Sequence, residues 1–197
     1  MADEVDPLED FLEGATWNAL VLLFYSPVTL GCLLWLYVYG GEWAVWDRTL
    51  GDEPLRDALL GSAVGFGMVL ATRLWARTGP GVQLTASLRD MFGGLTLGSA
   101  VLIAAASAIG EELLFRAVLQ PKLGLVGASV LFGLAHVPLD RSMWAWPVVA
   151  TLAGMVLGGL YVYTEAAFAS MVAHFVVNAL NLAWLGSGAT DSARSSR

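Results

Sequence analysis

Residues 104–121 read AAASAIGEELLFRAVLQP, and they place two adjacent carboxylates and a guanidinium inside an apolar segment. Glu111, Glu112 and Arg116 stand there among Ala, Leu, Ile and Val. A charge at the centre of a membrane-spanning helix costs about 2.5–3.5 kcal/mol on insertion scales. If this segment spans a membrane, the three side chains must therefore face the interior of a helix bundle or a water-filled cavity.

The composition of the whole chain is typical of an integral membrane protein. Of its 197 residues, 57% are hydrophobic and 14% are charged, whereas a soluble domain carries about 25% charged residues. A bilayer-spanning helix needs about 20 mostly apolar residues, and several segments without any charge are long enough. We therefore predict an all-α, polytopic membrane bundle of about six transmembrane helices, near residues 15–40, 56–76, 91–119, 123–138, 143–164 and 166–186.

The chain divides into four parts by composition. We expect an acidic N-terminal tail over residues 1–14, N-terminal transmembrane helices and loops over 15–90, a core over 91–186 and a flexible polar tail over 187–197. The connection at 77–90 contains a candidate amphipathic surface helix, GVQLTASLRDMF. Six of the 17 carboxylates lie in the first 13 residues, so the net charge of −7 mostly describes the tail. No basic stripe suggests a nucleic-acid partner.

The positions of Lys and Arg in the short loops favour both termini in the cytoplasm. That orientation gives the cytoplasmic side Arg73, Arg77, Arg89, Arg141, Arg194 and Arg197, and the opposite side Arg48, Arg56, Arg116 and Lys122. The first apolar run is too long for a signal-peptide core and follows an acidic leader, so we expect it to remain as an anchor. The Ala-, Leu- and Gly-rich composition suggests a bacterial inner membrane.

Two features of the apolar segments predict packing and no chemistry. Gly61 with Gly65, and Gly154 with Gly158, are small residues at four-residue spacing, which lets helices approach closely. Cys32 is the single cysteine of the sequence, so no disulfide can form within the chain, and we predict that Cys32 is a small buried apolar residue.

The three charges of the opening stretch allow two interpretations. Residues four apart share a helix face, so Glu112 can pair with Arg116, while Glu111 lies about 100° away around the helix. Glu111 is then available for another task. Alternatively, all three side chains form a buried ion-pair cluster that fixes helix packing, and the segment alone does not decide between these readings.

Two later helices add costly polar groups. His136 lies four residues after Phe132 in VLFGLAHVP, and Asn178 four after His174 in MVAHFVVNALN, so each pair shares a face. Each residue alone is typical of helix packing. The chain has two histidines, and both lie inside predicted helices of the same half as the carboxylate pair. Hydrolysis of an amide needs a base for water, a group that orients the water, and donors for the oxyanion, and this set supplies them.

These residues also resemble the motifs of a known family, the CPBP intramembrane proteases, also called the ABI family. Glu111–Arg116 (EELLFR) resembles its EExxxR motif, Phe132–His136 (FGLAH) its FxxxH motif, and His174–Asn178 (HFVVN) its HxxxN motif. The resemblance covers about residues 91–186. The family includes type II CAAX prenyl endopeptidases, bacterial members linked to bacteriocin processing or self-immunity, and myxosortase-type proteases.

The resemblance implies a role for each matched residue. Glu111 would be the general base, and His136 would help to hold and polarise the attacking water. His174 and Asn178 would stabilise the oxyanion, while Glu112, Arg116 and Phe132 would support the site. It implies an intramembrane endopeptidase. We favour a glutamate mechanism without a cofactor, because the HExxH arrangement of zinc proteases is absent and a Glu base with an Asn donor needs no metal. The alternative is a zinc site, in which Glu111, His136 and His174 hold the metal and leave an open position for water.

Three classes of function stay open at this point. The favoured one is an endopeptidase that acts on a membrane-associated protein or peptide, with a C-terminal or leader-type segment ranked above a CAAX substrate. The second is a non-proteolytic immunity or scaffold protein of the same fold. The third is a transporter or proton relay, which the lack of a repeat or of a broken-helix pair disfavours.

Overall fold

The computed structural model describes residues 7–138 and 140–195, and these residues form helices and no strand. The all-α class predicted from the sequence is confirmed. The elements in chain order are α1 (Pro7–Thr49), α2 (Pro54–Trp75), α3 (Gly79–Phe92), α4 (Leu97–Glu112), the π-helical segment η1 (Leu113–Leu119), α5 (Gln120–Ala135), the short 3₁₀ segment η2 (Arg141–Met143), α6 (Ala145–Thr164) and α7 (Phe168–Ser195).

Five described helical segments are long and apolar enough to cross a bilayer: Thr16–Thr49, Pro54–Trp75, Leu97–Ala135, Arg141–Thr164 and Phe168–Ser187. The third covers most of the third (91–119) and the fourth (123–138) predicted helices. These are separated by Gly124, whose backbone (φ 71°, ψ 171°) is not helical. Glycine reaches this conformation without the steric cost that a Cβ would add.

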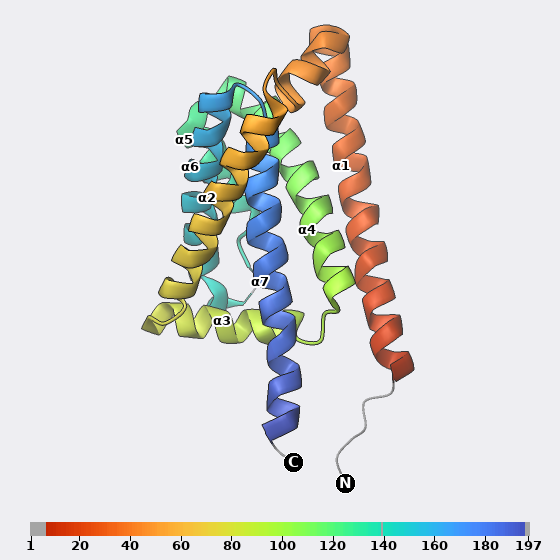
Figure 1. The fold of residues 1–197 in the computed structure, drawn as a ribbon, viewed down its shortest axis with the longest axis vertical. Helices are drawn as coiled ribbons and strands as arrows, with labels where there is room; N and C mark the ends of the chain where they lie inside the picture. Colours follow the sequence, from red (N-terminus) through yellow and green to blue (C-terminus); the bar gives the residue numbers. More distant parts are fainter. Residues whose placement is uncertain (1–6, 139, 196–197) are drawn as a thin grey trace.

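The long helices run side by side, and α3 lies across one end of the bundle (Figure 1). Helix α7 packs against α2 and α4, and α5 packs against α6. The start of α1 and the end of α7 lie at the same end as α3. This arrangement encloses the inner faces of α4, α5 and α7, which carry the motif residues.

Several boundaries differ from the expected ones. Helix α1 begins at Pro7, inside the segment expected to be a tail, and continues to Thr49 across a break at Gly41 (φ 76°). Helix α7 reaches Ser195, well into the expected polar tail. Residues 1–6 and 196–197 lie outside the described part of the chain. The surface helix expected near residues 81–92 is present as α3.

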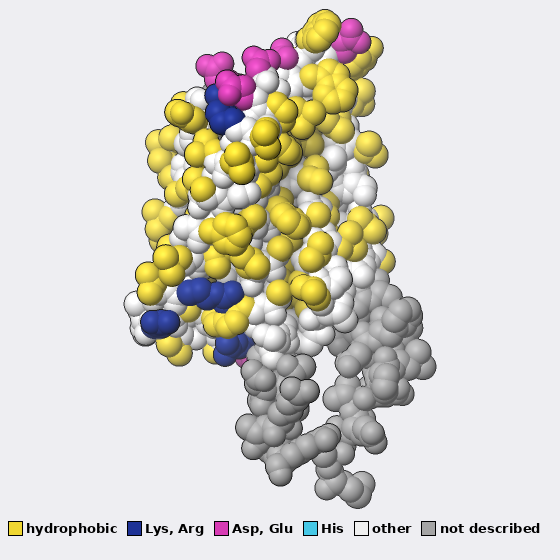
Figure 2. Space-filling view, in the orientation of Figure 1, with side chains coloured by type: hydrophobic (Ala, Val, Ile, Leu, Met, Phe, Trp, Pro, Cys, Tyr) yellow, Lys and Arg dark blue, Asp and Glu magenta, His cyan; other side chains and the backbone are white. Residues whose placement is uncertain are grey.

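The surface has the charge pattern of a membrane protein. Hydrophobic side chains cover the middle of the molecule, and most of the charged side chains in view lie toward its two ends (Figure 2). Leu23, Leu30 and Leu34 on α1 are each more than 60% exposed, as expected of residues that face lipid. Cys32 is buried against Leu36 and Leu113, as its lone position in an apolar run predicted.

The small residues Gly61 and Gly65 lie where α2 crosses α7. A Cβ on Gly61 would lie 2.4 Å from the Ala169 carbonyl oxygen, and one on Gly65 would lie 2.9 Å from that of Ala173. These distances leave no room for a methyl group, so the predicted close approach is confirmed. Gly154 also lies close to Ser129, between α6 and α5, but the contact is less tight, because a Cβ there would lie 3.2 Å from its nearest neighbour.

We expect Gly61→Ala to destabilise the protein by about 1–3 kcal/mol, because overpacking forces backbone shifts. Gly67→Ala is the matched control, since it adds the same methyl group to the same helix where nothing lies within 4 Å. Thermal unfolding of both variants in detergent checks the prediction. Equal melting temperatures would contradict it.

Candidate active site

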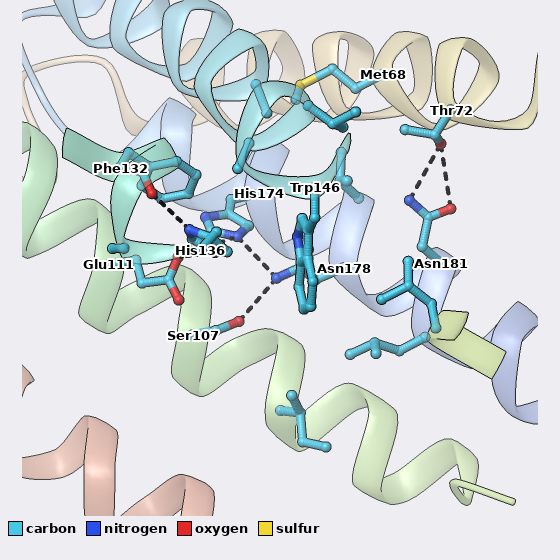
Figure 3. Close-up of a pocket in the computed structure, with 18 of the residues that line it drawn as sticks. Met68, Thr72, Ser107, Glu111, Phe132, His136, Trp146, His174, Asn178 and Asn181 are labelled. Carbon is cyan, nitrogen blue, oxygen red and sulfur yellow. Dashed lines mark hydrogen bonds and ion pairs between the residues drawn. The ribbon is translucent and has the colours of Figure 1, made fainter. Parts of the chain in front are cut away.

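A cavity of about 630 Å³ lies inside the bundle and brings the motif residues together. Its walls come from all seven α-helices and are mostly apolar. Polar groups gather at one place, where Glu111 from α4, His136 from the end of α5, and His174 and Asn178 from α7 face one another (Figure 3). Polar side chains from three separate helices therefore meet at one place inside the bundle.

Glu112 and Arg116 form a fully buried ion pair beside this point. Arg116 Nε donates to Glu112 Oε2 over 2.9 Å, and both side chains are 0% exposed. The second carboxylate oxygen, Glu112 Oε1, lies 2.8 Å from His174 Nδ1. Glu112 therefore does more than neutralise Arg116, because it also fixes the orientation of the His174 ring.

Glu111 has a different environment. The Tyr25 hydroxyl, from α1, donates a hydrogen bond to Glu111 Oε1. Glu111 Oε2 is buried and has no hydrogen-bond partner among the described groups. It lies 3.8 Å from His136 Nε2 and 4.0 Å from His174 Nε2. Polar groups at this separation are suited to interact through a single water.

The hydrogen bonds of His136 fix which of its nitrogens carries a proton when the ring is neutral. Its Nδ1 lies 2.8 Å from the Phe132 carbonyl oxygen, which can only accept. Nδ1 is therefore the donor, and Nε2, which faces Glu111, carries a lone pair. The Phe132 ring packs on both imidazoles, with centroids 4.6 Å from that of His136 and 6.0 Å from that of His174.

His174 and Asn178 extend the network to α4. Asn178 Nδ2 lies 2.9 Å from His174 Nε2 and 3.0 Å from Ser107 Oγ. With a neutral His174, both hydrogens of this amide are used. With a doubly protonated His174, the amide turns over, so that its oxygen accepts from His174 and Ser107 and its NH₂ group is released. The second pattern leaves donors for an oxyanion.

Three residues of this network were missed by the sequence reasoning. Ser107 lies four residues before Glu111, and this helical spacing was a usable signal. Gln120 accepts from Arg116 Nη1 (3.3 Å) and donates to the Gly158 carbonyl (2.8 Å), which fixes the ion pair against α6. Tyr25 lies in the first apolar run, far from the motifs, and no local pattern singled it out.

Gly110 explains how Tyr25 reaches Glu111. A Cβ on Gly110 would lie 2.7 Å from Tyr25 Cδ1 and 3.4 Å from Thr29 Oγ1. The absence of a side chain lets α1 approach α4 at this level. The first helix therefore contributes to the candidate site, although the motifs lie only on later helices.

The geometry also bears on the zinc alternative. No group of three or more His, Cys, Asp or Glu side chains within the described ranges is arranged to hold a metal ion. Zinc ligands at about 2.0–2.1 Å in a tetrahedron lie about 3.3–3.4 Å from one another. The separations of 3.8 and 4.0 Å between Glu111 Oε2 and the two imidazoles are wider than this. The zinc set Glu111, His136 and His174 stays a prediction for experiment.

Comparison with known families supports the resemblance that the motifs suggested. Residues 93–180 match the family described as "Type II CAAX prenyl endopeptidase Rce1-like". The match includes all three motifs and begins close to the predicted start of the core. The resemblance that the motifs suggested is therefore confirmed over this segment. Together with the apolar helices, it supports an integral, multi-pass membrane protein.

One curated relative is an uncharacterized protein, YpbD, of Bacillus subtilis (strain 168). It is 38% identical over 73 residues, which are 37% of this chain and 38% of the relative. The similarity thus spans well under half of either protein. No solved structure matches this one.

Proposed function

We propose that this chain, whose residues 93–180 are similar to type II CAAX prenyl endopeptidases, is an intramembrane endopeptidase of the glutamate type. It would hydrolyse a peptide bond of a membrane-associated protein or peptide. The observation that carries the proposal is the convergence of Glu111 Oε2, which has no described partner, with the Nε2 atoms of His136 and His174 in a mostly apolar cavity.

Water activation falls to Glu111 and His136. Both atoms that face each other, Glu111 Oε2 and His136 Nε2, are hydrogen-bond acceptors when His136 is neutral. A water between them donates one hydrogen to each, and its oxygen lone pairs then point away toward a substrate carbonyl. Glu111 takes one proton as the oxygen attacks the carbonyl carbon, which is general-base catalysis.

The same groups can complete the reaction. Attack converts the carbonyl oxygen into an oxyanion. The released NH₂ group of Asn178 stabilises it by donating hydrogen bonds, and a doubly protonated His174 stabilises it by its positive charge. The proton held by Glu111 then passes to the amide nitrogen, the carbon–nitrogen bond breaks, and a carboxylic acid and an amine leave. Glu112 and Arg116 do not touch the reacting atoms, and their task is to hold His174.

The cavity favours an apolar, extended substrate. Besides the polar groups at the site, its lining includes Phe92, Trp146 and Leu185, which suit the side chains of a membrane-embedded segment. We place the substrate among C-terminal or leader-type membrane segments. We place both termini of the protease in the cytoplasm of a bacterial inner membrane, from the distribution of its Lys and Arg residues.

The proposal is tested by comparing the termini of membrane proteins from cells that produce the wild-type chain and cells that produce Glu111→Gln. We expect a small set of new termini that appear only with the wild-type protein. A synthetic peptide that spans one of these sites should be cut by the purified enzyme at the same bond. Identical termini in the two strains would refute the proposal.

Tyr25→Phe removes the hydroxyl that holds Glu111 Oε1 and keeps the ring. We expect kcat to fall about 10- to 100-fold, because a hydrogen bond to a charged group contributes about 1.5–3 kcal/mol, with KM little changed. Tyr37→Phe is the control, since Tyr37 lies on the same helix and is 59% exposed. A change in KM alone would show that Tyr25 binds substrate and does not position the base.

Chelation tests the zinc alternative. We expect a protein that has been dialysed against a strong chelator to keep its activity, because a Glu base with an Asn donor needs no metal. Metal analysis of the same sample provides the control. Activity that is lost on chelation and restored by zinc would establish the zinc-dependent version and assign Glu111, His136 and His174 as its ligands.

A further inference from the structure

Two arginines contact a single indole ring at the end of the bundle where α3 lies. The guanidinium carbon of Arg73, from α2, is 3.8 Å from the ring centroid of Trp184 on α7. The guanidinium carbon of Arg89, from α3, is 4.7 Å from the same centroid. The contact joins three helices, and Trp184 also lines the cavity of the candidate active site.

This cationic pair has no anionic partner within the described part of the chain. The ion pairs recorded there involve Arg56, Arg116 and the two histidines. Arg73 Nη2 donates to the Leu180 carbonyl (3.0 Å), whereas its Nη1 is buried and makes no hydrogen bond. The indole face attracts each cation, but two like charges on one ring repel each other unless an anion lies between or beside them.

We propose that Arg73, Arg89 and Trp184 form a binding site for the phosphodiester headgroup of an anionic membrane phospholipid. A guanidinium can donate two parallel hydrogen bonds to phosphate oxygens. The exposed guanidinium of Arg89 presents such a pair, and Arg73 adds a second positive charge over the same ring. Arg73 lies in the last turn of α2, at the end of a candidate span, which is the depth at which headgroups lie. Trp184 is suited to the same boundary.

The charge of the surrounding surface selects an anionic lipid over a zwitterionic one. Figure 2 shows Lys and Arg side chains at the end where α2 meets α3, and most of the Asp and Glu side chains in view at the opposite end. Arg77 follows Arg73 by four residues and is exposed on this end. A zwitterionic headgroup brings its own cation into this positive surface, whereas a phosphatidylglycerol headgroup brings none.

The bound lipid would tie α2, α3 and α7 together beside the cavity. Thr72, Leu88 and Trp184, one from each of these helices, all line that cavity. Lipid bound at the site would therefore hold α3 in place against α7 beside the cavity wall. This inference does not depend on the proposed protease activity.

Native mass spectrometry of the full chain, after equilibration with equal amounts of phosphatidylglycerol and phosphatidylcholine, tests the site. We expect the wild-type protein to retain phosphatidylglycerol in excess. In the double variant Arg73→Gln/Arg89→Gln, the ratio of bound phosphatidylglycerol to bound phosphatidylcholine should fall about 5-fold for each arginine removed. Arg77→Gln removes one charge from the same end without touching Trp184 and should retain the preference. Arg89→Gln alone, at an exposed position, replaces the double variant if the latter does not fold.

Two results would overturn the proposal. If the wild-type protein retained both lipids equally, there would be no selective lipid site. If Arg77→Gln and Arg89→Gln lost the preference for phosphatidylglycerol to the same extent, the preference would come from the general surface charge and not from this site. A third arm identifies the source of the phosphate. If inorganic phosphate alone raised the melting temperature of lipid-free wild type but not of the double variant, the site would bind phosphate from solution, and the lipid assignment would be wrong.

Discussion

Glu111→Gln is expected to lower peptide-bond cleavage by about 10²–10⁴-fold, the usual range for loss of a general base. The substitution keeps the size of the side chain and leaves an oxygen that can accept the hydrogen bond from Tyr25. It removes the carboxylate at the place where Glu111 Oε2 faces both imidazoles. An amide cannot take a proton from water at neutral pH, so the loss should appear in kcat.

The measurement is cleavage of a peptide that the wild-type enzyme cuts, followed by mass spectrometry of the products. Glu42→Gln is the matched control, because it makes the same exchange at an exposed position of α1. Thermal unfolding and gel filtration of both variants in detergent establish that they are folded. Full activity of Glu111→Gln would remove this residue from the mechanism.

The same variant separates the three classes of function. A non-proteolytic scaffold or immunity protein would keep its biological phenotype when Glu111 or His136 is replaced. A proton relay would lose proton-coupled flux in liposomes, with no effect on the termini of other proteins. A protease loses both the cleaved termini and the phenotype, which is the result that we expect.

Much of the fold could be predicted from the sequence because lipid imposes a simple rule. Long apolar runs between charged residues predicted the spans, and Gly61 and Gly65 predicted a close helix crossing that α2 and α7 make. The ends of the helices were less predictable. The part of α1 after the break at Gly41 makes a long-range contact, in which the Arg48 carbonyl accepts from the Ala167 N–H, and a local pattern does not contain such a contact.

The candidate site was predictable where its residues follow helical spacing. The pairing of Glu112 with Arg116 is a four-residue contact, and the structure has it at 2.9 Å. The bond of Glu112 to His174 joins residues 62 apart in the chain and could not be read from either motif. The contact of Tyr25 with Glu111 could not be predicted for the same reason, because it depends on how closely α1 approaches Gly110.

Arg116→Met is expected to have the largest effect on stability. Loss of one partner from a buried ion pair costs about 3–5 kcal/mol, because the remaining charge is left without compensation. Here the remaining charge would be the Glu112 carboxylate, which is 0% exposed and would keep only His174 as its partner. Thermal unfolding in detergent should therefore show a large fall in melting temperature.

The double variant Glu112→Gln/Arg116→Met separates charge balance from the orientation of His174. It removes both charges, so most of the lost stability should return, as is found when a buried pair is replaced as a unit. Cleavage should stay below that of the wild type, because an amide at position 112 no longer fixes one tautomer of His174. If the double variant were as unstable as Arg116→Met, the stabilising contact of Arg116 would be its bond to Gln120 or its position over the Phe132 ring, 5.3 Å from the centroid.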